Sequence, residues 1–90
     1  MSTLSATIRP SILFVDDEEP ILSSLKSLFR KEAYNLFTFT NGKDAVEFIK
    51  HHPIDIIVSD MRMPELSGIE FLNQASNISP ESVRIMLSGY

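Results

Sequence analysis

Residues 11–20 read SILFVDDEEP, and this stretch decides the fold. Its apolar part, ILFV at 12–15, is short, partly β-branched and continuous, which is typical of a strand buried on both faces. Four acids follow directly at 16–19, and Pro20 suits the first turn of a helix. The sequence therefore places four negative charges at the carboxyl end of a buried strand, which predicts a cation-binding site there.

The charge of the rest of the chain supports this interpretation. The 90 residues contain twelve acids and eight Lys or Arg, for a net charge of −4. Four of the twelve acids lie at 16–19, so the remaining eight balance the eight basic residues. Direct binding of nucleic acid or of an anionic membrane surface is not expected, because either would need a basic patch.

Composition and the amino terminus narrow the class further. Ninety residues allow one small domain, and the absence of Cys excludes disulfides and Cys-ligated zinc. No apolar run approaches the length of a membrane span, and residues 1–10 lack the features of a secretory signal. We expect residues 1–10 to form a disordered N-terminal tail, residues 11–90 to form the domain, and the protein to be cytoplasmic.

The hydrophobic pattern alternates between strand and helix. Apolar blocks at 12–15, 34–39, 54–59 and 82–88 are typical of strands. Between them, apolar residues at helical spacing predict three helices, marked by Ile21, Leu22, Leu25, Leu28 and Phe29, by Ala45, Val46, Phe48 and Ile49, and by Ile69, Phe71, Leu72 and Ala75. This βαβαβαβ order predicts an α/β fold with parallel strands and helices on both faces of the sheet.

Polar groups lie at the carboxyl ends of three of these strands. In open parallel sheets, ligands bind outside those ends, where the strand order switches. The first strand ends at Asp16 and Asp17, the third at Asp60 and the fourth at Ser88, whereas the second ends without an acid. We therefore expect three carboxylates and one hydroxyl to converge on one rim.

That rim has the chemistry of a phosphoryl-transfer site. Crowded carboxylates repel, so at least one pKa rises unless a cation intervenes. Oxygen ligands favour Mg²⁺, which we expect Asp16 and Asp17 to hold. A carboxylate beside such a metal can attack phosphorus, and Asp60, alone at its strand end, is the best candidate. Ser88 can donate a hydrogen bond to a phosphoryl oxygen.

Each feature also has a structural interpretation. The acids at 16–19 suit a helix N-terminus, and Glu18 and Glu19 are expected to do only that. Asp60 and Ser88, taken singly, are common turn residues. The pair at 51–52, two histidines before a proline, is expected to cap a helix C-terminus rather than bind metal. The side chain of Arg62 is consistent with a solvated loop charge.

Three segments together resemble a known family. ILFVDDEEP (12–20), DIIVSDMRMPELSG (55–68) and RIMLSGY (84–90) resemble the receiver domain of two-component response regulators. The resemblance covers about residues 11–90, with the segments in order and at the expected spacing. It implies a flavodoxin-like, doubly wound parallel sheet with strand order 2-1-3-4.

The resemblance also implies roles for single residues. Asp60 would accept a phosphoryl group from a sensor histidine kinase or a phosphotransfer protein. Asp17 would bind Mg²⁺ directly and Asp16 mainly through water. Asp60 would also belong to the metal site, and the backbone carbonyl of Arg62 would complete the protein ligands. Ser88 would move toward the phosphoryl group. Such a protein is a signalling switch whose only activities are its own phosphorylation and dephosphorylation, rather than a conventional enzyme.

The resemblance departs from the family pattern after strand four. Receivers continue with a further helix, a fifth strand and a last helix, and they carry a phosphoryl-binding Lys and a switch aromatic that cannot be assigned within these 90 residues. We expect an ordered part of a longer chain, a shortened form of one, or an oligomer completed by exchange of elements. An exposed apolar edge from Val83 to Leu87 would favour self-association.

Two other functions compete with the receiver. A Mg²⁺-dependent phosphatase of the haloacid dehalogenase type also forms an aspartyl phosphate, but it requires a second acid two residues after the nucleophile, where this chain has Arg62. An interaction module that works without phosphorylation is the other alternative. The cognate kinase and the output cannot be read from these residues.

Overall fold

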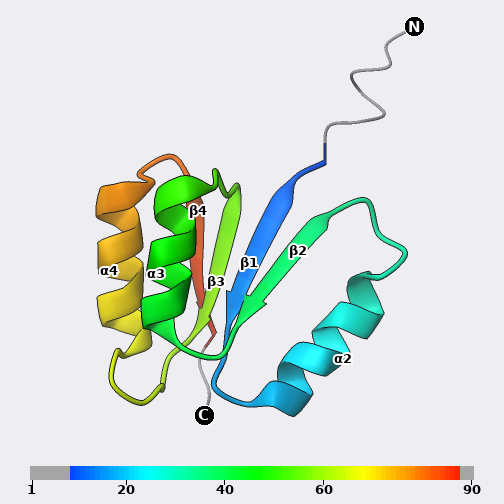
Figure 1. Ribbon diagram of the computed structural model, residues 1–90, viewed down its shortest axis with the longest axis horizontal. Helices are drawn as coiled ribbons and strands as arrows, with labels where there is room; N and C mark the ends of the chain where they lie inside the picture. Colours follow the sequence, from blue (N-terminus) through cyan, green and yellow to red (C-terminus); the bar gives the residue numbers. More distant parts are fainter. Residues whose placement is uncertain (1–8, 88–90) are drawn as a thin grey trace, which may run out of the picture.

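The computed structural model describes residues 9–87, and these form one parallel sheet with three helices (Figure 1). In chain order the elements are β1 (Ser11–Val15), α2 (Glu19–Phe29), β2 (Asn35–Phe39), α3 (Gly42–His51), β3 (Ile56–Asp60), α4 (Gly68–Ile78) and β4 (Val83–Leu87). The strands are ordered β2-β1-β3-β4, and every neighbouring pair is parallel. The predicted α/β fold and its strand order 2-1-3-4 are confirmed.

Local sequence signals explain where the helices begin. Pro20 lies in the first turn of α2, where its missing N–H costs nothing. Asn41 precedes α3 and its side chain accepts a hydrogen bond of 2.8 Å from the Asp44 amide. Ser67 and Glu70 form a reciprocal capping box at the start of α4. Each of these helix starts follows a strand, so each lies at the carboxyl edge of the sheet (Figure 1).

The sheet separates two layers of helices. Leu13, Val15 and Ile57 are buried against α3 and α4, which pack side by side on one face. Phe14 points to the other face, because side chains alternate along a strand. There its ring meets Phe29 of α2 in an edge-to-face contact, with 6.1 Å between ring centroids. The expected cover of helices on both faces is therefore present.

The starts of three strands and the apolar faces of the helices differ from the predictions. The third strand begins at Ile56 rather than at residue 54, because the chain bends at Asp55, whose carboxylate accepts a 2.8 Å hydrogen bond from the Ser11 amide. The second strand begins at Asn35 rather than at residue 34, and the described part of the fourth begins at Val83 rather than at residue 82. Not every apolar residue at helical spacing is buried. The exposed ones in α2 and α4 are Ile21, Leu28 and Ile69.

The ends of the described range bear on two further predictions. Residues 1–8 of the predicted tail lie outside the described residues, while the Pro10 carbonyl accepts a 2.9 Å hydrogen bond from the Asn35 amide. On β4, Val83, Ile85 and Leu87 are exposed on one face, in agreement with the expected apolar edge. Among residues 9–87, we find no helix with the length and apolar character needed to span a membrane.

Candidate functional site

Three carboxylates meet at the carboxyl edge of the sheet. β1 and β3 are neighbours, and Val15 pairs with Ser59, so the residues that follow, Asp16 and Asp60, lie level with each other. Asp17 joins them from the turn into α2. One carboxylate oxygen from each of the three residues lies within 4.8 Å of the other two. The sequence predicted this convergence from the strand ends alone.

Asp16 is the most buried member of the group. Its side chain is almost fully enclosed, its amide donates a 3.0 Å hydrogen bond to the Phe39 carbonyl, and its Oδ1 accepts a 2.9 Å hydrogen bond from the Glu18 amide. Burial is the main cause that raises the pKa of Asp16, and the charges of Asp60 and Asp17 raise it further against the lowering effect of the Glu18 amide.

The raised pKa of Asp16 affects stability in a definite direction. Over the pH range from its ordinary value of 3.8 up to its raised value, the folded protein binds more protons at Asp16 than the unfolded chain. The contribution of Asp16 to the free energy of unfolding therefore falls as pH rises through that range, in the absence of a divalent cation. The expected rise of at least one pKa is confirmed, with burial rather than repulsion as its largest cause.

Asp60 is the last residue of β3 and is held tightly by its neighbours. Its Oδ1 accepts a 2.9 Å hydrogen bond from the Met61 amide, and its Oδ2 accepts none from residues 9–87. Gly68, the first residue of α4, packs directly on the backbone of Asp60 and Met61, and its amide donates a 3.0 Å hydrogen bond to the Met61 carbonyl. This contact fixes where the strand ends and thus where the Asp60 carboxylate points.

The three carboxylates line a cleft of about 420 Å³. The residues that line it are Asp16, Asp17, Glu18, Ile21, Asp60 and Arg62. We expect from the sequence that Glu18 acts only at the helix start and that Arg62 contributes only its backbone carbonyl, so the side chains of Glu18, Arg62 and Ile21 are additions to the predicted site. Their positions in the sequence could have indicated this role, because Ile21 lies in the first turn after the acids and Arg62 lies two residues after Asp60.

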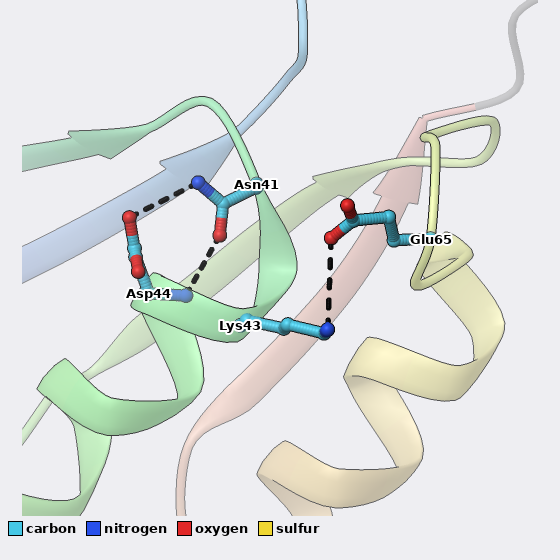
Figure 2. A network of polar contacts seen from close by, with 4 residues as sticks. All are labelled: Asn41, Lys43, Asp44 and Glu65. Carbon is cyan, nitrogen blue, oxygen red and sulfur yellow. Dashed lines mark hydrogen bonds and ion pairs between the residues drawn. The ribbon is translucent and has the colours of Figure 1, made fainter.

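The loop between β3 and α4 carries Arg62 past the cleft. No backbone amide of residues 9–87 donates to the Arg62 carbonyl, so that oxygen is available as a ligand. Further on, Glu65 has a φ of 70°, and the Leu66 amide donates to the Pro64 carbonyl at 2.7 Å. Figure 2 shows the Glu65 carboxylate directed at Lys43 of α3, with 3.7 Å between Oε1 and Nζ. Ser88 lies outside the described residues.

The donor set fits a hard divalent cation such as Mg²⁺. Every ligand atom offered by Asp16, Asp17 and Asp60 is a carboxylate oxygen, and Mg²⁺ prefers such oxygens at about 2.1 Å together with several waters. Two oxygens bound to one such ion are about 3–4 Å apart, and the three carboxylate oxygens lie within 4.8 Å of one another. A water between the ion and the carboxylate of Asp16, the most buried of the three, would bridge the remaining distance.

One of the two histidines, His52, caps the C-terminus of α3 as the sequence predicted. His52 is the C-terminal cap residue of α3, and its Nδ1 lies 3.0 Å from the Phe48 carbonyl oxygen. Its ring also stacks on the Phe48 ring, with 3.9 Å between centroids. Neither His51 nor His52 belongs to the acidic group. The capping prediction is therefore confirmed for His52, whereas His51 is the last residue of α3 itself.

Comparison with known proteins identifies the family. The model of the response regulator receiver domain matches residues 12–90, so the chain belongs to that family, whose members act in two-component systems and phosphorelays. The chain is 35% identical over 80 residues to the hydrogenase transcriptional regulatory protein HoxA of Cupriavidus necator, covering 89% of this chain and 16% of that protein. It is 34% identical to sporulation initiation phosphotransferase F of Bacillus subtilis, covering 84% of this chain and 60% of that protein.

Solved structures agree with this assignment. The signal receiver domain of an HD domain-containing protein from Pseudomonas fluorescens superposes with a TM-score of 0.87 at 29% identity, covering 92% of this chain and 66% of that one. The chain thus spans less than two thirds of each of these three proteins. Members of this family generally bind Mg²⁺ and interact with histidine kinases or phosphotransfer proteins.

Proposed function

We propose that this chain is a phosphoacceptor switch in which Asp60 receives a phosphoryl group from a sensor histidine kinase or a phosphotransfer protein. The observation that carries the proposal is the convergence of Asp16, Asp17 and Asp60 around an open cleft, within 4.8 Å of one another. A surface role alone gives no reason to crowd three like charges, one of them buried, because that crowding is costly without a cation. A receiver needs this arrangement.

The transfer step follows from the hydrogen bonds of Asp60. Because Oδ1 is held by the Met61 amide, Oδ2 is the oxygen free to attack phosphorus. As the new O–P bond forms, the P–N bond of the donor phosphohistidine breaks, and the imidazole leaves with a proton from solvent. In the dephosphorylation half of the cycle, a water oxygen attacks phosphorus and the Asp60 O–P bond breaks, so the carboxylate is restored and inorganic phosphate, which keeps the protons of the water, is released.

The neighbouring acids supply the metal ligands in this proposal. Asp17 would contact Mg²⁺ directly, Asp16 would act mainly through water, and Asp60 and the Arg62 carbonyl would complete the protein ligands. Bound Mg²⁺ supplies charge neutralisation for the phosphoryl oxygens. The hydrogen bond from the Glu18 amide fixes one Asp16 oxygen and leaves the other for this role. Ser88 is proposed to donate a hydrogen bond to the phosphoryl group.

Intact mass spectrometry tests this function. After incubation with acetyl phosphate and Mg²⁺, the chain should gain one phosphoryl group, and it should gain none without Mg²⁺ or in Asp60→Asn. Asp44→Asn is the matched control, because it removes an exposed carboxylate that does not line the cleft. Equal labelling of Asp60→Asn and wild type would refute the proposal, and no labelling at all would favour a module that binds partners without phosphorylation.

We also propose that β4 mediates self-association with a second copy. Val83, Ile85 and Leu87 are 57%, 43% and 47% exposed and share one face. In an antiparallel pair of β4 strands centred on Ile85, Arg84 faces Met86 rather than another Arg84, so no like charges meet. Sedimentation should show a dimer that grows with concentration and is lost in Ile85→Lys. A monomer at every concentration would rule this out.

A further inference from the structure

Arg62 is the one basic residue among the described residues that line the cleft. The other charged lining residues are Asp16, Asp17, Glu18 and Asp60. Arg62 is two residues past Asp60, and its side chain is exposed to solvent at the mouth of the site. A cation in this position is suited to contact an anion that enters the cleft, since the metal proposed here is itself positive.

The guanidinium of Arg62 is not committed to the acids beside it. Among residues 9–87 the ion pairs are Lys43 with Glu65 and Lys50 with Glu47, and Arg62 pairs with no carboxylate within 4.0 Å. No described hydrogen bond uses its side chain either. The arginine therefore lies at an acidic cleft without being neutralised by it, and its donors are available to a ligand.

The charge balance of the cleft shows what such a ligand would gain. With every carboxyl ionised, the lining carries four negative charges and one positive charge. A bound divalent cation leaves one net negative charge, and without Arg62 it would leave two. A phosphodonor is itself anionic, so the guanidinium lowers the repulsion that it meets on entry. The planar fork of an arginine also matches the oxygens of a phosphoryl group better than an ammonium does.

We propose that the Arg62 side chain binds the phosphoryl oxygens of the incoming donor and of the phosphorylated Asp60. This inference rests on the proposed function and deepens it, because it assigns a phosphoryl-binding cation within the residues described. Arg62 then has two separate roles: its backbone carbonyl binds the metal, and its side chain binds the anionic phosphoryl group. Substitution of the side chain therefore affects the two ligands differently.

The opposite effects on metal and phosphoryl group make the proposal testable. Arg62→Gln should lower the rate constant for phosphorylation by acetyl phosphate about 5-fold, the size expected for one exposed charge-assisted hydrogen bond. It should weaken binding of beryllium fluoride, a phosphoryl mimic, by a similar factor. Calorimetry with Mg²⁺ alone should show equal or tighter binding in Arg62→Gln, because a positive charge near the ion has been removed. Damage to the loop would instead weaken all three.

Two further variants separate local from general effects. Arg62→Lys keeps the charge without the fork and should restore part of the loss. Lys26→Gln removes the same charge from the exposed side of α2, away from the cleft, and should match wild type. The difference between wild type and Arg62→Gln should also shrink at high salt.

The outcomes are distinct. If wild type gains no phosphoryl group, the proposed function fails. If wild type is phosphorylated and Arg62→Gln keeps its rate and its beryllium fluoride affinity, only this inference fails. If Arg62→Gln weakens Mg²⁺ binding as well, Arg62 is a structural residue of the loop and the inference is overturned.

Discussion

Gly68 makes the closest backbone contact at the site, so Gly68→Ala is the most informative structural perturbation. A Cβ at this position would lie 3.0 Å from the Met61 Cα and 3.1 Å from the Asp60 carbonyl carbon, and it would overlap the Asp60 carbonyl oxygen. Ordinary contacts between carbon atoms are about 3.5–4.0 Å. Since all three atoms belong to the backbone, β3 and α4 must separate by roughly half an ångström or more.

The expected cost follows from this overlap. Overpacking of this kind costs about 1–3 kcal/mol, and the better helix propensity of Ala offsets up to about 1 kcal/mol. We expect Gly68→Ala to lower the free energy of unfolding by about 2 kcal/mol, which corresponds to a drop in Tm of about 8–16 °C. Because Asp60 moves with the end of β3, its phosphorylation by acetyl phosphate should also slow.

Gly42→Ala provides a matched control. Gly42 is likewise the first residue of its helix, α3, but a Cβ there meets a methyl group of Leu66 at 2.8 Å rather than backbone. The end of a leucine side chain can rotate away, so we expect Gly42→Ala to stay within about 1 kcal/mol of wild type. Thermal denaturation followed by circular dichroism measures both variants. Equal Tm values for the two would show that the Gly68 contact does not hold the strand end.

Three further perturbations test the loop, the acidic group and the helix cap. Glu65→Gly should raise the stability by about 0.5–1 kcal/mol, because the residue has a φ of 70° and its ion pair with Lys43 is exposed; a loss in urea denaturation would contradict this. Asp16→Asn in chelator should raise Tm at neutral pH, because it removes a charge that is disfavoured first by burial and then by its acidic neighbours. The gain is about 4–8 °C if these two effects together cost about 1 kcal/mol, and it should shrink as pH falls toward 3.8; a constant gain at every pH would count against the raised pKa. Ser67→Ala should cost about 1 kcal/mol through loss of the capping box, and an unchanged urea midpoint would argue that the cap contributes nothing.

Much of the fold was predictable because burial and strand alternation leave strong local patterns. The stretches at 12–15 and 56–58 are apolar throughout because both layers of helices cover the central strands β1 and β3. The convergence of Asp16 and Asp60 followed from their places at strand ends, while the order of the strands came from the family resemblance. The bend at Asp55 was missed because it depends on a hydrogen bond to Ser11, 44 residues away in sequence.

The parts of the site that escaped prediction share a physical cause. Arg62 and Ile21 are surface residues, and their role depends on which loop faces which strand end. Hydrophobic periodicity in the sequence does not predict that arrangement. The left-handed conformation of Glu65 could not be predicted from the sequence either, because Gly or Asn is the usual residue at such a φ. Exposure of Leu28 could not be read from helical spacing either, since spacing predicts a face and not what covers it.

The central claim is that Asp60, and no other carboxylate of the cleft, carries the phosphoryl group. Tandem mass spectrometry of peptides from the chain labelled with acetyl phosphate and Mg²⁺ tests it most directly. The account predicts a single modified residue, Asp60, with Asp16 and Asp17 unmodified in the same digest. Label on either of those two residues or on His51 or His52, or an unlabelled Asp60 peptide, would contradict it.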